Sequence, residues 1–207
     1  MSEPTFLMVQ VGHRSSSSIK ANLGALSRQT HKNWKLVYVN DGNDDHTTSE
    51  FKRYTQMYGL KDRLIFISNE KEEGLAQCLW KALKMRKSET HAILMKGKHR
   101  FSQDRALEKI AQAHSKGWAV VWGKWRDQLG NISESGALHP YEELRQQPWI
   151  FGGPLSFELK YLSNLTESDL KTTETETFFN EAGMQAFGYG ICEATIKRRF
   201  LREVLFT

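Results

Sequence analysis

Short apolar runs alternate with helical patterns through the first 120 residues, and this alternation constrains the fold more than any other feature. Five runs predict strands, at 6–11, 36–39, 64–67, 92–95 and 118–122. Between them, apolar residues recur at the spacing of one helix face. Strands separated by helices need crossover connections, which are right-handed and set the strands in parallel. The chain is therefore predicted to be an α/β protein with a mainly parallel central sheet flanked by helices.

Four segments predict the helices between these strands. The first follows the serines at 15–18, which offer N-caps, and a polar helix is expected at 47–58. Gly74 is expected to open a third helix, and Ser102 to cap a fourth. The chemistry of helix ends thus agrees with the apolar periodicity.

The second half of the chain is less regular. We expect a hairpin turn at 129–131, a helix at 155–162, an apolar helix beginning at Phe178 and a basic helix over the cationic group at 197–202. No repeat or linker interrupts the chain, which predicts a single domain over residues 1–207.

Composition excludes some broad classes. With 39% hydrophobic and 26% charged residues, the chain can build a packed core. Its apolar runs are too short to span a membrane, and its N-terminus lacks the signal-peptide pattern. Cys78 and Cys192 lie far apart, so we expect two reduced thiols and a cytoplasmic location. The net charge of +5 mildly favours anionic partners, although solvated helix faces would account equally well for the basic clusters.

Two lysines follow the fourth predicted strand directly. The apolar run of this strand ends at Met95, and the next three residues are Lys96-Gly97-Lys98. In open α/β sheets, ligands bind beyond the carboxyl ends of the strands. Acidic pairs at this spacing hold a divalent metal against a diphosphate, whereas here the charges are reversed.

Four segments, in order, carry a family resemblance. Residues 27–42 contain a Gln-Thr pair, an Asn followed by the aromatic Trp, an apolar strand and then Asn-Asp-Gly. Residues 69–75 begin with Asn and end in Gly-Leu. Residues 91–110 hold the lysine pair and a Leu-Glu-Lys helix, and 149–154 end in Gly-Gly-Pro. This order resembles the family-2-like nucleotide-diphospho-sugar glycosyltransferases of GT-A fold. The resemblance is good over the first 110 residues and patchy afterwards.

The resemblance implies a donor-binding half at 1–123 and an acceptor half at 124–207. Asp41, at the end of the second strand, would accept the imide hydrogen of uracil, unless it only caps its own turn. A UDP-sugar is the favoured donor. The residues expected to bind it are Val11, His13, Asp41, Gly74, Lys96, Lys98 and His99.

The chain departs from the family at its metal-binding motif. The Asp-x-Asp position is Lys96-Gly97-Lys98, and a charged lysine has no lone pair for Mg²⁺ or Mn²⁺. No cofactor is therefore expected, and a divalent metal would need ligands outside the usual motif. Three explanations stay open: the lysines neutralise the diphosphate, the catalytic centre has decayed, or true acidic ligands lie nearby, with Asp104 the candidate. Asn40 and the Leu79-Trp80 pair also replace polar residues that the family uses.

An inverting transfer also needs a general base for the acceptor hydroxyl. The acidic, threonine-rich segment at 173–179 resembles the element that supplies it, which makes Glu174 the first candidate and Glu176 the second. Asp169 is the third. The alternative for each is an acidic first turn favoured by the helix dipole.

Aromatic residues and glycines of the second half are candidates for the acceptor. Trp125 and Trp149 could stack on a sugar or a base, although most tryptophans are core residues. Gly152 and Gly153 match the glycine pair of the family's acceptor half. A saccharide or lipid-linked saccharide is the favoured acceptor, and nucleic acid is the alternative.

Overall fold

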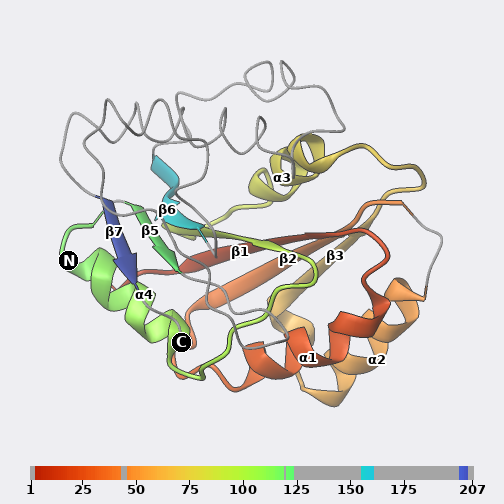
Figure 1. Cartoon of the computed structure of the whole chain (residues 1–207), viewed down its shortest axis with the longest axis horizontal. Coiled ribbons are helices and arrows are strands. Elements are labelled where there is room, and N and C mark those ends of the chain that lie inside the picture. Colours follow the sequence, from red (N-terminus) through yellow and green to blue (C-terminus); the bar gives the residue numbers. More distant parts are fainter. Residues whose placement is uncertain (1–2, 43–45, 119, 124–154, 161–200, 205–207) are drawn as a thin grey trace.

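The computed structural model describes residues 3–42, 46–118, 120–123, 155–160 and 201–204. Within these residues, one sheet has the strand order β3-β2-β1-β4-β6-β5-β7 (Figure 1). Its strands are β1 (Phe6–Gly12), β2 (Trp34–Asn40), β3 (Leu64–Ser68), β4 (His91–Lys96), β5 (Val120–Gly123), β6 (Leu155–Glu158) and β7 (Leu201–Val204). The helices are α1 (Ser16–Ser27), α2 (Thr47–Met57), α3 (Leu75–Leu83) and α4 (Ala106–Ser115), with a short 3-10 turn at Lys61–Arg63.

The four strands β3, β2, β1 and β4 are parallel, which confirms the predicted α/β class. Their carboxyl ends share one edge, because Val11 is in register with Val39 of β2 and with Lys96 of β4. Beyond β4 the sheet becomes mixed: β6 pairs antiparallel with both β4 and β5, and β5 pairs parallel with β7.

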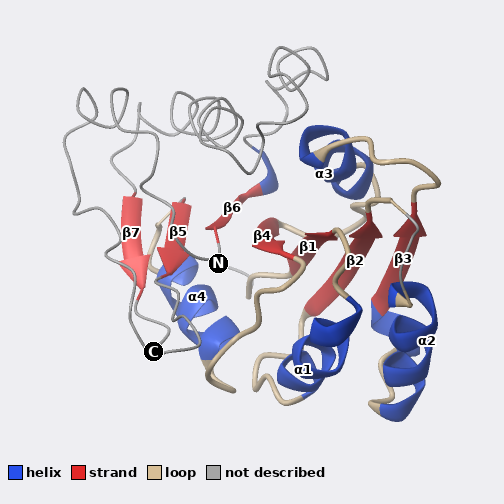
Figure 2. Ribbon diagram, turned by 45° about the vertical axis from the view of Figure 1, so that its right-hand side comes forward, coloured by secondary structure: helices blue, strands red, loops and turns tan. Residues whose placement is uncertain are grey.

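Helices cover both faces of this sheet. Successive side chains of a strand point to opposite faces. Leu7, Val9 and Val11 pack with α3, whereas Phe6 and Met8 pack with the helices of the other face, α1, α2 and α4. Figure 2 shows α3 on one side of the parallel strands and α1 and α2 on the other. Burial on both faces explains why these strands are continuous apolar runs.

Two predicted helices are wrong. Residues 155–158, expected to begin a helix, form strand β6, and residues 201–204, at the end of the expected basic helix, form strand β7. The residues Leu155, Ser156 and Phe157 are all buried, so this strand shows no alternation that would separate it from a buried helix. Pairing with β4 and β5, which are distant in sequence, decides its conformation.

Smaller corrections concern element ends. Arg105, not Ser102, is the N-cap of α4, and the fifth strand begins at Val120 rather than at 118. Ser15 does occupy the N-cap of α1, but its hydroxyl donates to the His13 carbonyl and caps no helical N–H. The turn expected at 129–131 and the helix expected at Phe178 lie outside the described residues. In the part of the chain that is described, no helix combines the length and the apolarity needed to cross a membrane.

Candidate functional site

The carboxyl edge of the parallel strands brings together the predicted donor-binding residues. Val11 is near the end of β1 and Lys96 is the last residue of β4. His13 and Asp41 directly follow β1 and β2, and Gly74 is the N-cap of α3, as predicted. His13 and Gly74, which are 61 positions apart in sequence, thus lie in loops at the same edge of the sheet. This is the edge at which open α/β sheets bind ligands.

The two lysines flank a tight turn that is pressed against the end of β1. The Gly97 N–H donates to the Val11 carbonyl at 2.7 Å, and the His99 N–H donates to the Lys96 carbonyl at 2.9 Å. A Cβ added at Gly97 would lie 2.4 Å from the Cα of Gly12. Only glycine therefore allows this approach, which sets the two lysines one on each side of the contact. We call residues 96–99 the lysine turn.

Positive charge dominates the lysine turn. Lys96 and Lys98 are both exposed, although partial desolvation of the Lys96 ammonium lowers its pKa. Burial, followed by the charge of Lys96, lowers the pKa of His99 to about 4. The imidazole is then neutral near pH 7, so the lysines carry the charge of this turn.

Asp41 is buried, with 4% of its surface exposed, and its carboxylate organises the loop before α3. Its Oδ1 accepts from the Glu73 N–H at 2.8 Å and from Asn69 Nδ2 at 2.9 Å, and its Oδ2 accepts from the Gly74 N–H at 2.9 Å. A carboxylate offers about four acceptor positions. Three are used by these N–H groups, and the Cys78 thiol also lies within hydrogen-bonding reach of the carboxylate.

A polar network extends from Asp41 along the inner side of α3. Asn69 Nδ2 also donates to Cys78 Sγ at 3.3 Å, and Lys81 Nζ donates to Asn69 Oδ1 at 3.2 Å and to Glu73 Oε1 at 2.6 Å. Burial, with the neighbouring Asp41 charge, raises the pKa of the Cys78 thiol well above its usual range. The network fixes α3 to the ends of β2 and β3, and the neutral thiol belongs to the core.

His13 lies beside the turn that follows β2. Its Nδ1 donates to the Asp41 carbonyl at 2.7 Å, because a carbonyl can only accept. Gly42 has a φ of +86°, and a Cβ there would lie 3.2 Å from the His13 ring. The imidazole is exposed and held on one side, which leaves its other surfaces accessible to a ligand. Val11, by contrast, has its side chain in the core.

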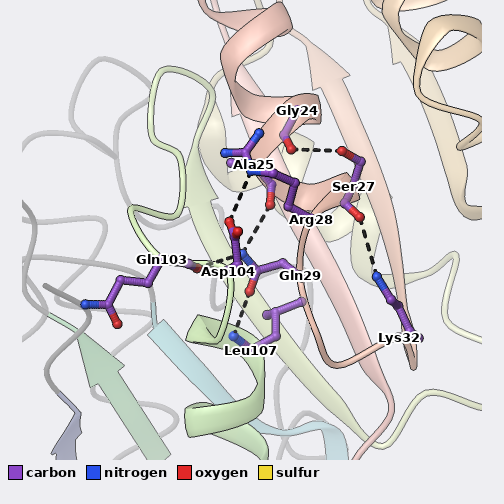
Figure 3. Close-up of polar contacts among 9 residues, drawn as sticks. All are labelled: Gly24, Ala25, Ser27, Arg28, Gln29, Lys32, Gln103, Asp104 and Leu107. Carbon is purple, nitrogen blue, oxygen red and sulfur yellow. Dashed lines mark hydrogen bonds and ion pairs between the residues drawn. The ribbon is translucent and has the colours of Figure 1, made fainter.

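The residues of the lysine turn do not fit a divalent metal, since neither ammonium group can donate a lone pair. Across the described ranges, no group of three or more His, Cys, Asp or Glu side chains could hold a metal ion. Asp104, the acidic candidate nearest in sequence, lies before α4, where its Oδ1 accepts from Arg28 Nε at 3.1 Å (Figure 3). That exposed ion pair is a contact between α1 and the loop before α4.

Several predicted site residues lie outside the described residues and stay predictions. They are the candidate bases Asp169, Glu174 and Glu176 and the acceptor candidates Trp125, Trp149, Gly152 and Gly153.

Sequence reasoning missed two of the three buried amides at this edge, Gln10 and Asn22, and named the third, Asn40, only as a departure from the family. Gln10 Nε2 donates to the His99 carbonyl at 2.9 Å, and Asn22 Nδ2 donates to the Gly97 carbonyl. Asn40, fully buried, has no partner for either side-chain atom among the described residues. A signal was available, because Gln10 interrupts an apolar strand and Asn22 falls on the apolar stripe of α1.

A family model matches most of the chain. The family model "Glycosyl transferase family 2" matches residues 13–186. Comparison with the curated proteins gave no match.

Solved structures share the fold at low sequence identity. Residues 1–349 of TarS from S. aureus match with a TM-score of 0.71 and 14% identity, over 97% of this chain and 58% of that one. The same protein in complex with UDP-GlcNAc matches with a TM-score of 0.70 and 14% identity, over 97% and 56%. The mannosyltransferase PcManGT from Pyrobaculum calidifontis, in complex with GDP-Man and Mn²⁺, matches with a TM-score of 0.69 and 13% identity, over 99% and 56%. This chain thus spans somewhat more than half the length of these proteins.

Proposed function

Since this chain belongs to glycosyl transferase family 2, we propose that it transfers a sugar from a nucleotide-diphospho-sugar to a hydroxyl acceptor, with inversion and without the usual metal site. The observation that carries the proposal is the lysine turn. It presents two lysines, both exposed residues, at the carboxyl end of β4, beside the end of β1. A donor diphosphate is an anion of the kind that such a site would bind.

The ends of β1 and β2 support binding of a nucleobase. Oδ2 of Asp41 accepts the Gly74 N–H, and a carboxylate oxygen can accept a second hydrogen bond, here from the imide N–H of uracil. His13, exposed beside Asp41, could stack on the base. TarS has been solved with UDP and with UDP-GlcNAc, and PcManGT with GDP-Man, so a nucleoside diphosphate is the shared part of the donors in these complexes. We favour UDP for this chain.

The lysines would act on the leaving group. As the acceptor oxygen bonds to the anomeric carbon, the bond from that carbon to the diphosphate breaks and the diphosphate gains negative charge. Fixed cations near developing charge lower the barrier. Lys96 and Lys98 would supply these cations from the protein itself.

The acceptor proton needs a base, and we propose one of the acidic residues named above. Glu174 is the first candidate, followed by Glu176 and then Asp169. The carboxylate would take the hydroxyl proton while the acceptor attacks from the face opposite the leaving diphosphate. A saccharide or lipid-linked saccharide is the proposed acceptor. A cytoplasmic location is proposed as well, and the free, buried Cys78 thiol supports it.

Calorimetric titration with UDP in excess EDTA tests the donor site. We expect binding by the wild-type chain and a loss of about tenfold or more in K96A/K98A, since two cations at a diphosphate are removed. The matched control, K52A/K116A, removes the same charge from exposed positions of α2 and the end of α4, and should bind as wild type. Equal losses in both double variants would show that only net charge matters.

Hydrolysis or transfer from a UDP-sugar tests the chemistry. Turnover should survive EDTA, and its abolition with rescue by Mn²⁺ would refute the role given to the lysines. Failure to bind either UDP or GDP would refute the donor site itself.

A binding module without catalysis is the second candidate, because the site lacks the acidic motif of its family. It predicts UDP binding in EDTA but no turnover with or without Mn²⁺ over a panel of saccharide and lipid-linked acceptors. Turnover under either condition would exclude it.

A further inference from the structure

Two buried side-chain amides, of Gln10 and Asn22, hydrogen-bond to the backbone on both sides of Lys98. Gln10, from β1, donates its Nε2 to the carbonyl of His99 at 2.9 Å, and Asn22, from α1, donates its Nδ2 to the carbonyl of Gly97. These are the carbonyls that precede and follow the Lys98 backbone by one residue. The two amides come from different elements and reach the same turn.

This arrangement leaves polar atoms unsatisfied. Gln10 is 1% exposed and Asn22 is 2% exposed, and Oε1 of Gln10 and Oδ1 of Asn22 have no partner among the described residues. An unpartnered buried oxygen destabilises a fold unless ordered water satisfies it. An apolar pair at these positions would avoid that penalty. Polar residues that break a local rule in this way are concentrated at functional sites.

We propose that Gln10 and Asn22 are positioning residues, which clamp the lysine turn so that Lys96 and Lys98 are held ready for an anionic diphosphate. The proposal rests on the function proposed above and adds to it residues that touch no substrate. Their role is to hold the lysine turn in its bound conformation beforehand, so that less conformational entropy is lost when the anion binds. Without them, the Gly97 N–H bond to the Val11 carbonyl would remain as the link between the turn and β1.

Another buried glutamine shows what a purely structural amide looks like in this protein. Gln29, 0% exposed, donates to the carbonyls of Ala25 and Gln103 at 3.1 and 2.8 Å, and accepts from the Leu107 N–H at 3.0 Å (Figure 3). Both its Nε2 and its Oε1 are hydrogen-bonded, and the side chain joins α1 to α4. Gln29 is therefore a matched control for Gln10, since both are buried glutamines whose Nε2 donates to the backbone carbonyl of a distant loop residue.

The test is a double-mutant cycle on UDP affinity in EDTA. Q10M and N22L keep the side-chain size and remove the donor, and Q29M does the same at the control position. We expect Q10M and N22L to weaken UDP binding about tenfold. In the K96A/K98A background the same substitutions should have no further effect, because the clamps act through the lysines. Q29M should lower the melting temperature and leave UDP affinity unchanged.

Titration of the His99 imidazole by NMR gives a readout that needs no ligand. In Q10M, we expect its pKa to rise from about 4 toward its ordinary value of 6.5, because the freed turn exposes the ring to water. The proposal would be overturned if the wild-type chain binds UDP and Q10M and N22L bind it with the same affinity. It would also be overturned if these substitutions weaken UDP binding equally in the wild-type and K96A/K98A backgrounds. An unchanged His99 titration would also overturn it. Absence of UDP binding by the wild-type chain alongside a shifted His99 titration would instead refute the donor function, and with it the clamps' role in binding.

Discussion

The G97A substitution should separate the stability of this protein from its ligand binding. A Cβ at Gly97 would meet the Cα of Gly12 at 2.4 Å, the N of Gly12 at 2.9 Å and the carbonyl oxygen of Val11 at 3.0 Å. Ordinary carbon–carbon contacts lie at about 3.5–4.0 Å, so the overlap exceeds about 1 Å. All three atoms belong to the backbone of β1 or its end, and none can rotate aside as a side-chain tip could.

The lysine turn must therefore move away from β1. Overpacking of this kind destabilises a domain by about 1–3 kcal/mol, which for a chain of this size lowers the melting temperature by about 2–4 °C per kcal/mol. The larger effect should fall on the ligand. A displacement of about 1 Å can weaken a positioned contact by up to about a hundredfold, so we expect UDP affinity to fall about tenfold or more.

G59A provides the matched control. Gly59 has a φ of +63° with no atom within 4 Å of an added Cβ, so alanine there strains the backbone without a clash. That strain amounts to about 1–2 kcal/mol, comparable to the loss expected for G97A. Thermal unfolding would measure the two stabilities, and calorimetry with UDP in EDTA the two affinities. Wild-type UDP affinity in G97A, or an equal loss in G59A, would refute the reasoning.

Three further predictions concern other buried groups. Burial lowers the pKa of His91 to about 4 and that of His114 to about 3, below the ordinary 6.5. The free energy of unfolding should therefore be at its full value above pH 6.5 and fall as the pH drops toward 4, by about 2 kcal/mol per histidine at pH 5. Urea unfolding would measure this fall, and the pH dependence should be shallower in H114Q. The two carboxylate oxygens of Asp41 accept three N–H groups, and D41N replaces one of these oxygens with an NH2 donor. Urea unfolding should therefore show a loss of about 1–3 kcal/mol in the free energy of unfolding. An unchanged stability would mean that these contacts do not hold α3. Cys78, with its pKa raised by burial and by Asp41, should react with a thiol reagent only after unfolding, and reaction in the native state would contradict its placement.

Much of the first half of the fold could be predicted because its signals are local. The strands at 6–11, 36–39, 64–67 and 92–95 were placed within one or two residues, since buried parallel strands are short apolar runs between helical patterns. Gly74 was expected to open a helix and is its N-cap, with a φ of +83°.

The strand β6 could not be predicted in the same way. Its sequence, Leu-Ser-Phe-Glu, follows a glycine-rich segment and fits a helix as well as a strand. The choice is made by pairing with β4 and β5, whose residues lie about 30 to 70 positions earlier in the chain. Local propensity is a weak guide where tertiary partners supply the hydrogen bonds.

The site divides along the same line. The sequence alone determined that a lysine pair ends a buried strand and that an aspartate ends another, because strand ends follow from the apolar pattern. Only the tertiary structure decided what holds these residues. Gln10 reaches the His99 carbonyl across 89 positions and Asn22 reaches the Gly97 carbonyl across 75, and no local pattern encodes such contacts. They exist because parallel strands bring distant carboxyl ends to one edge, where a buried amide finds a carbonyl that the sheet itself leaves unpaired.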